Sequence, residues 1–152
     1  YKCFENLSSI EIGDSITDIG ERAFFKCPSL QSITIGAGVA SIGKYAFSYD
    51  TSLKQIIVKN ENMLLKSENN VLFSKDGNIL YRYPHTKNSE YIVPDTTKII
   101  ELDAFGDSAA LTSITIPNSV EKIMNDAFDG CDNLKNVYFE GSASDWKKIK
   151  IE

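Results

Sequence analysis

Apolar and polar residues alternate in short stretches that recur along the chain. The stretch Leu111-Thr-Ser-Ile-Thr-Ile116 alternates apolar with small polar residues, and residues 30–35 repeat this pattern. A period of two with β-branched residues predicts a strand that has one buried face. A turn signal follows at Pro117-Asn118, and a second short extended piece ends at Ile123. An Ala-Phe pair then comes at 127–128, where we expect a compact helical turn.

The same unit recurs with a period of 23 residues. Leu7, Leu30 and Leu53 are 23 apart (30 − 7 and 53 − 30), and so are Leu111 and Leu134 (134 − 111). The agreement continues inside the units, which predicts an internal repeat. The aligned columns are Ile12, Ile35, Val93 and Ile116, then Ile19, Ile42, Ile100 and Ile123, then the Ala-Phe pairs at 23–24, 46–47, 104–105 and 127–128.

One unit alone is too small to fold. Burial of about six large apolar side chains contributes roughly 12 kcal/mol, whereas ordering about 23 residues costs on the order of 35 kcal/mol of backbone entropy. Stacking adds burial on both faces of a unit and backbone pairing between successive strands. The sequence therefore predicts a β-rich repeat solenoid with short helical turns.

The stretch SITIPNSVEKIMNDAFDGC at 113–131 resembles the BspA-like leucine-rich repeats of bacterial cell-surface proteins at almost every fixed position. The resemblance covers nearly the whole chain. It implies a curved leucine-rich repeat solenoid of the α/β horseshoe-type superfamily, with a strand ladder on its concave side. It also implies a secreted or surface-attached bacterial protein with a role in adhesion to host or other cells. Asp50 and Ser108 replace the cysteine found at Cys27 and Cys131, and we attach no functional meaning to that departure.

We interpret residues 1–152 as a single leucine-rich repeat domain, excised from a longer protein. A partial coil at 1–6 is followed by repeats that start near 7, 30, 53, 88 and 111, and a closing unit covers 134–152. In the closing unit we expect Ser144 to cap a short helix that carries Trp146 and covers the last coil.

The repeat from 53 to about 87 is longer than the others. It has 35 residues (88 − 53), and it contains the stretch VLFSKDGNILYRYP at 71–84. This stretch predicts a hairpin with Asp76-Gly77 in a type I′ turn. We expect its tip, residues 74–78, to project beyond the regular surface.

Composition and candidate chemistry argue against several classes of function. The formal charge of −5 argues against a nucleic-acid partner. The chain has no apolar run of the roughly 20 residues that a transmembrane segment needs. Its only histidine, His85, follows Pro84 in a predicted exposed turn, so we infer that the protein is not an enzyme.

The same residues give no support for a metal or a cofactor. The carboxylates are scattered, with no calcium-binding loop, and a single histidine cannot form a multi-histidine metal site. The three cysteines, at 3, 27 and 131, have no CxxC spacing. We expect them to be buried reduced thiols. A Cys3–Cys27 disulfide is the alternative, because the two positions could be vertical neighbours in adjacent coils.

The outward face of the ladder is the candidate binding surface for a protein or glycan ligand. Side chains alternate along a strand, so one register places a set of residues in a single outward column. That column is Glu11, Thr34, Ile57, Ile92, Thr115 and Tyr138, to which we add the hairpin tip at Asp76 and Gly77. Exposed apolar members would be contact residues. We favour the alternative that the hairpin or Trp146 covers them. A second hypothesis for the whole segment is a structural spacer, with recognition elsewhere in the parent chain.

Overall fold

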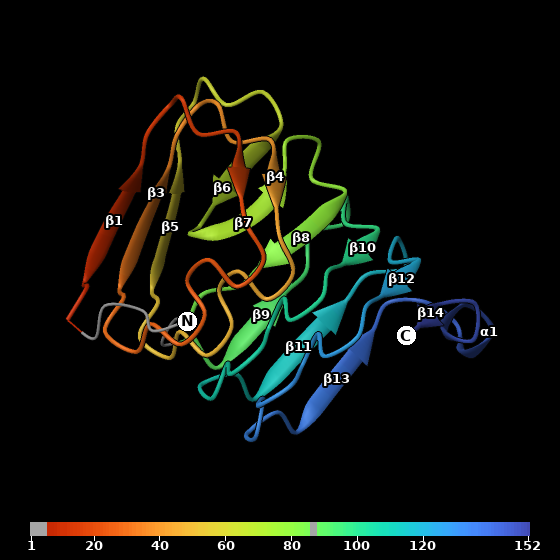
Figure 1. Cartoon of the computed structure of the whole chain (residues 1–152). Helices are drawn as coiled ribbons and strands as arrows, with labels where there is room; N and C mark the ends of the chain where they lie inside the picture. The colour runs from red at the N-terminus through yellow and green to blue at the C-terminus, as the bar shows by residue number, and fades with distance from the viewer. Residues whose placement is uncertain (1–5, 86–87) are drawn as a thin grey trace.

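Each repeat contributes one strand to the first side of a solenoid (Figure 1). In the computed structural model, which describes residues 6–85 and 88–152, these strands pair in parallel with the strand one repeat later, except at the step from β5 to β9. They are β1 (Ser9–Ile12), β3 (Ser32–Ile35), β5 (Gln55–Val58), β9 (Glu90–Ile92), β11 (Ser113–Ile116) and β13 (Asn136–Phe139). The predicted ladder and its alternation are confirmed, because Ile33, Ile35, Ile114 and Ile116 are buried.

The second extended pieces form another side of the solenoid. They are β2 (Asp18–Ile19), β4 (Ser41–Ile42), β8 (Ile79–Arg82), β10 (Ile99–Ile100), β12 (Lys122–Ile123) and β14 (Lys150–Ile151). β2 pairs with β4, whereas β8, β10, β12 and β14 belong to one six-stranded sheet. The repeat solenoid predicted from the sequence is therefore the fold of the protein.

The segments that carry the Ala-Phe pairs close each coil as tight turns rather than as helices. In each of them a residue with positive φ precedes the alanine, at Arg22, Tyr45, Asp103 and Asp126. The alanine amide donates to the carbonyl three residues earlier, as from Ala46 to Gly43. The turns also stack, since the Phe24 amide donates to the Ala46 carbonyl and the Phe105 amide to the Ala127 carbonyl. We call these four segments, 21–26, 44–49, 102–107 and 125–130, the turn segments.

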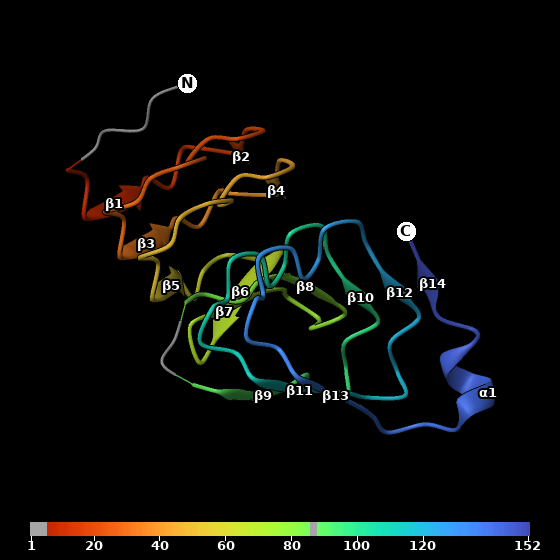
Figure 2. The same ribbon diagram turned by 90° about the horizontal axis from the view of Figure 1, so that it is seen from below.

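The ladder is divided in two and bends at the division. β1, β3 and β5 form one three-stranded sheet and β9, β11 and β13 another, and no pairing joins β5 to β9 among the described residues. The path of the ladder changes direction between these two strands (Figure 2). Hydrogen bonds cross the inside of the bend between turn segments, one of them joining Tyr45 to Asp126 over 81 residues of sequence. The ladder thus lies on the outer side of the bend, and the concave ladder implied by the resemblance is not what this chain forms.

The long repeat causes this division by adding two strands, β6 (Leu65–Glu68) and β7 (Val71–Ser74). The predicted hairpin is present, because β7 pairs antiparallel with β8. Its turn is not type I′, since Gly77 has a φ of 79° but Asp76 is not among the residues with positive φ. A hydrogen bond from the Gly77 amide to the Ser74 carbonyl closes this turn. The type I′ turn lies instead at Asn69-Asn70, whose φ angles are 50° and 68°, between β6 and β7.

Substitutions at Asn70 test this turn. Asn70→Gly should leave the free energy of unfolding unchanged or raise it by up to about 0.5 kcal/mol, because glycine takes positive φ without a steric penalty. Asn70→Val should lower it by about 1–2 kcal/mol, because a β-branched residue is strained in that conformation. Urea unfolding of both variants measures the difference. Equal stability of the two would contradict the assigned turn.

Strand β7 separates two hydrophobic cores and contributes to both. Val71 and Phe73 belong to the core of the C-terminal half, together with Phe105. Leu72 belongs to the core of the N-terminal half, together with Leu53. Both faces of β7 are thus buried, so its three apolar residues follow one another without polar interruption.

A one-turn helix, α1 (Ala143–Trp146), precedes β14. Its N-cap is Ser142, not Ser144 as predicted, because the Ser142 hydroxyl accepts from the Asp145 amide and the Asp145 carboxylate reaches back to the Ser142 amide. Trp146 packs edge-on against Phe139, with 5.2 Å between ring centroids. Within the described residues no helix is long and apolar enough to span a bilayer.

The state of the cysteines differs from the prediction at one position. Cys27 is disulfide-bonded and fully buried, so the expectation of a reduced thiol there is wrong. Equivalent positions of adjacent coils lie about one strand spacing apart, which falls within the Cα separation of a disulfide. The other cysteine of the proposed pair, Cys3, lies outside the described residues. Cys131 is a free thiol, as predicted, but it is half-buried and not fully buried, and it donates to the Phe105 carbonyl.

Candidate functional site

The C-terminal half of the ladder presents two exposed apolar side chains on a regular sheet. Ile92 is 69% exposed and Tyr138 is 57% exposed. Both are direct neighbours of Thr115, because the register pairs Thr115 with Ile92 on one side and with Tyr138 on the other. The three side chains point outward, since Ile114 and Ile116 beside Thr115 point into the core. We call this surface the outer ladder face.

The N-terminal half of the ladder forms a separate column. Its register pairs Thr34 with Glu11 and with Ile57. Ile57 is 40% exposed, and Glu11 forms an ion pair with Lys59 at 3.3 Å. The prediction of one continuous column of six residues is wrong, because the inserted strands of the long repeat divide the ladder between Ile57 and Ile92. The register within each half agrees with the predicted alignment.

Neither of the two proposed covers lies over the exposed apolar residues. Trp146 packs on Phe139, the neighbour of Tyr138 whose side chain points to the opposite face of β13. The hairpin strand β7 is itself buried between the two cores. The expectation that these elements cover Ile57, Ile92 and Tyr138 is therefore wrong.

The hairpin tip packs against the next coil instead of projecting from the surface. Gly77 is buried, and a Cβ added there would lie 2.8 Å from the Thr96 hydroxyl. Asp76 is exposed, but its carboxylate accepts from the Ser74 hydroxyl and from the Asn78 backbone and side chain, which lowers its pKa. These hydrogen bonds hold the turn, so Asp76 has a structural role and Gly77 is not available for contact.

His85 is half-buried, which contradicts the prediction of an exposed residue. Burial, with the nearby Arg82 charge, lowers the pKa of His85 to about 4. Its backbone amide donates to the Leu53 carbonyl, which anchors the chain beside the N-terminal core. The sequence could not show this, because the partner of the His85 amide, Leu53, lies 32 residues earlier at the start of the long repeat.

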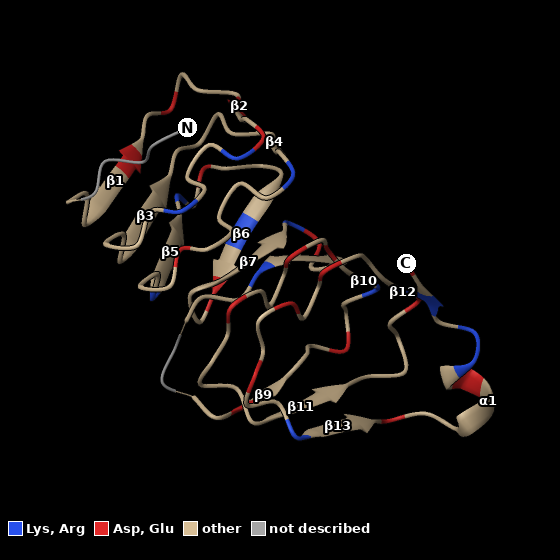
Figure 3. Ribbon diagram, turned by 60° about the horizontal axis from the view of Figure 1, so that its bottom comes forward, with Lys and Arg blue, Asp and Glu red and all other residues tan. Residues whose placement is uncertain are grey.

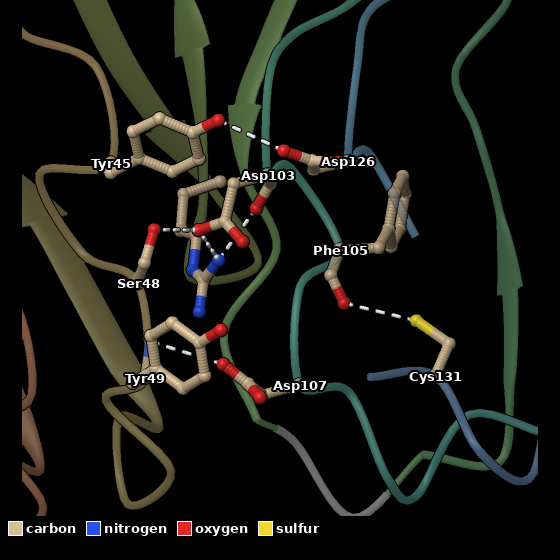
Figure 4. Close-up of polar contacts among 9 residues, drawn as sticks. Tyr45, Ser48, Tyr49, Asp103, Phe105, Asp107, Asp126 and Cys131 are labelled. Atoms are coloured by element: carbon tan, nitrogen blue, oxygen red, sulfur yellow. Dashed lines mark hydrogen bonds and ion pairs between the residues drawn. The ribbon is translucent and has the colours of Figure 1, made fainter. Parts of the chain in front are cut away.

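A buried ion pair that the sequence did not indicate holds the junction between the halves (Figure 4). Arg82 Nη1 lies 2.7 Å from the Asp103 carboxylate, and the two side chains are only 2% and 10% exposed. The Ser48 hydroxyl donates to the same carboxylate across the bend. Burial raises the pKa of Asp103, and the charge of Arg82 partly offsets that rise. We call Ser48, Arg82 and Asp103 the junction triad.

Two further hydrogen bonds cross the inside of the bend, between turn segments of the two halves. The Tyr45 hydroxyl donates to Asp126 at 2.8 Å, and the Tyr49 amide donates to Asp107 at 3.0 Å. Figure 4 shows the tyrosines on one side and the aspartates on the other. The hydrogen bond to Asp126 raises the pKa of Tyr45. In sequence, the signal was weak: the two columns hold basic residues and then tyrosines in the N-terminal half, whereas three of their four positions in the C-terminal half are aspartates.

The repeat sequence matches one family model along almost its whole length. The model of the BspA-type leucine-rich repeat region matches residues 1–81 and 80–149, with six copies of the repeat. The chain belongs to the BspA-type leucine-rich repeat family. The resemblance seen in the repeat columns is thereby confirmed. No curated protein matches the sequence.

Solved structures of other bacterial leucine-rich repeat proteins share the fold of this family member. The pneumococcal vaccine antigen PcpA is 26% identical with a TM-score of 0.72, and the match covers 88% of this chain and 39% of that one. A leucine-rich repeat protein from Eubacterium ventriosum is 20% identical with a TM-score of 0.56, covering 87% of this chain and 60% of that one. One from T. pallidum is 19% identical with a TM-score of 0.51, covering 88% and 70%. The chain thus spans 39% and 60% of the lengths of the first two.

The described residues give no other obvious chemistry. No group of three or more His, Cys, Asp or Glu among them is placed to hold a metal ion. Lys and Arg are distributed over several elements of both halves instead of lining one face (Figure 3). The outer ladder face and the inside of the bend are therefore the two candidate binding surfaces among the described residues.

Proposed function

We propose that this BspA-type repeat domain is a non-enzymatic binding module of a secreted or surface-attached bacterial protein, and that it binds a protein partner through the outer ladder face. The observation that carries the proposal is the pair Ile92 and Tyr138, exposed on either side of Thr115. Exposed aromatic and aliphatic groups on a rigid surface are the usual anchors of protein interfaces. The likeness to a pneumococcal vaccine antigen supports a location at the cell surface.

The rigidity of this face favours binding. The three side chains stand on backbone that is paired from β9 through β11 to β13, and their strands sit on buried Ile114 and Ile116. A partner therefore does not have to order a loop on association, and the entropic cost of binding is low. The apolar character of Ile92 and Tyr138 favours a protein over a glycan at this face. The net charge of −5 disfavours nucleic acid.

Substitutions on the outer ladder face test the proposal against a panel of extracellular matrix proteins. The double variant Ile92→Asp with Tyr138→Ala should weaken binding at least about tenfold, because loss of a hot-spot residue costs 2 kcal/mol or more. Ile151→Asp is the matched control, since Ile151 is 62% exposed on β14, in a different sheet. Its binding, measured by surface plasmon resonance, should equal that of the parent.

Two outcomes speak against the proposal. Unchanged affinity of the double variant would remove the outer ladder face as the binding site. Absence of binding by this segment, with binding retained by the remainder of the parent protein, would support the structural spacer. The N-terminal half of the ladder favours the spacer, because its outward side chains are less available to a partner. Thr34 is half-buried, and Glu11 forms an ion pair with Lys59.

A further inference from the structure

The inside of the bend contains a pocket of about 250 Å3 that lies away from the outer ladder face. It is lined by side chains of both halves of the solenoid. The N-terminal turn segments supply Arg22, Phe25, Tyr45, Ser48 and Tyr49, and the C-terminal segments supply Asp103, Asp126 and Asp129. Pockets between two packed units are a common location of ligand sites. Because repeats that are distant in sequence form it, this pocket exists only as a result of the bend. We call it the inner-bend pocket.

One wall of the pocket is aromatic and carries positive charge at its edge. Phe25 and Tyr49 pack edge to face, with 5.3 Å between ring centroids. Arg22 lies 5.6 Å from the ring centroids of both Phe25 and Tyr45, and Lys26 lies 5.2 Å from that of Tyr49. These contacts fix the rings in place. Tyr49 is nevertheless 44% exposed, so part of its ring is open to a ligand.

The opposite wall offers hydrogen-bond acceptors. Asp103 is occupied by Arg82 and Ser48, and one oxygen of Asp126 accepts from Tyr45. Within the described part of the chain, no hydrogen bond or ion pair is found for the Asp129 carboxylate or for the second oxygen of Asp126. Both residues are exposed and both line the pocket.

The aromatic, cationic and carboxylate groups that line the pocket together indicate the chemical class of its ligand. A metal ion is disfavoured because the carboxylates do not converge as a ligand set. A simple ion of either sign is also disfavoured, because the lining contains both a guanidinium, from Arg22, and the carboxylates of Asp126 and Asp129. A neutral ring with several hydroxyl groups suits all of these features, since it donates to carboxylates, accepts from cations and lays an apolar face on an aromatic side chain. We propose that the inner-bend pocket binds a saccharide unit, with Tyr49 as the stacking platform and Asp129 as the acceptor of its hydroxyl groups.

The volume of the inner-bend pocket limits how much of a glycan can be bound inside it. A pocket of about 250 Å3 lies below the range of roughly 300–1,000 Å3 that drug-sized ligands occupy. It therefore holds a single sugar ring, and the remainder of a longer glycan would extend into solvent. Affinity for a monosaccharide is expected in the millimolar range, with higher apparent affinity for multivalent glycan surfaces.

Saturation-transfer NMR with the whole chain tests this site directly. The probes are glucose, galactose, mannose and N-acetylglucosamine, each at millimolar concentration, with free lysine and acetate as charged comparisons. At least one sugar should show saturation transfer and should shift the resonances of Tyr49. Asp129→Asn should weaken that binding at least about fivefold, because hydrogen bonds to a charged group are the stronger ones. This variant should fold normally, since Asp129 is exposed and its side chain has no partner among the described residues.

Further variants separate this site from the outer ladder face. Tyr49→Ala should abolish detectable sugar binding, whereas Tyr138→Ala should leave it unchanged, because Tyr138 belongs to the outer ladder face. The proposal is overturned if no sugar binds, or if Asp129→Asn and Tyr49→Ala both bind like the parent. Stronger binding of lysine than of any sugar would also overturn it, since the carboxylate wall would then be a site for cations. None of these results bears on the protein-binding role of Ile92.

Discussion

Asp103→Ala is expected to lower the free energy of unfolding by about 3–5 kcal/mol. The substitution removes the ion pair with Asp103 from the guanidinium of Arg82, whose side chain is only 2% exposed. It also removes the acceptor of the Ser48 hydroxyl, which is itself buried. A buried charge without a partner carries a large desolvation penalty. Urea unfolding at neutral pH, followed by circular dichroism, measures the change.

Two companion variants determine whether the effect belongs to the junction triad. Asp107→Ala removes an exposed hydrogen bond across the same bend, from the Tyr49 amide, and should cost less than about 1 kcal/mol. Arg82→Met combined with Asp103→Ala should be more stable than Asp103→Ala alone, because the unpaired charge is gone. A cost below about 1 kcal/mol for Asp103→Ala, or a double variant less stable than the single one, would contradict this account of the junction.

Stability is expected to fall by about 2 kcal/mol as the pH rises from 6.5 to 8, because of Asp50. This side chain is fully buried, and burial raises its pKa from 3.8 to about 8. Between these values the native state holds a proton that the unfolded state has lost. Stability therefore decreases by about 1.4 kcal/mol for each unit of increasing pH.

His85 changes the shape of this dependence below pH 6.5. Its folded pKa of about 4 lies below its ordinary value of 6.5, so the unfolded state holds the extra proton between these values. The contribution of neutral His85 to stability is present above pH 6.5 and is lost as the pH falls toward 4. The slopes of Asp50 and His85 are opposite in sign and offset each other from pH 4 to 6.5. Above that range the opposing slope of His85 is absent and the slope of Asp50 remains.

Asp50→Asn separates the two contributions. Asparagine keeps the shape of the side chain and an oxygen that accepts from the Cys27 amide, but it does not ionise. The variant should be flat in stability from pH 6.5 to 8, and should lose stability as the pH falls below 6.5. Urea midpoints measured at half-unit steps of pH provide the test. The same decline above pH 6.5 in parent and variant would assign it to another group.

The regular part of the fold could be predicted from sequence because it depends on local pattern. Leu30, Ile33 and Ile35 recur one repeat later as Leu53, Ile56 and Val58, and all six are buried. Stacking is a contact between neighbouring units, so the spacing of 23 residues in sequence already determines which residues are adjacent in space. The outward register of Thr115 with Tyr138 follows from the same spacing.

The junction could not be predicted, because it depends on how one irregular repeat changes the direction of the stack. The hydrogen bond from Tyr45 to Asp126 joins residues 81 apart, which occupy the same position in repeats that are not neighbours in the stack, so the period alone does not bring them together. The turn at Asn69-Asn70 could have been found, since two residues that tolerate positive φ lie between β-rich stretches. Its effect on the bend depends on packing in three dimensions. The inner-bend pocket, which this bend creates, had no signal in the sequence for the same reason.

The double packing of β7 determines how the chain comes apart. In a regular solenoid, stability is a sum of repeat and interface terms, so unfolding proceeds from the ends and halts at weak interfaces. Here Leu72 lies in one core while Val71 and Phe73 lie in the other, so removal of this strand exposes both cores at once. The two halves of the solenoid are therefore not expected to unfold independently at the break in the ladder between β5 and β9. Under a stretching force the outer repeats should peel away first, and the two halves should then rupture together in one cooperative step.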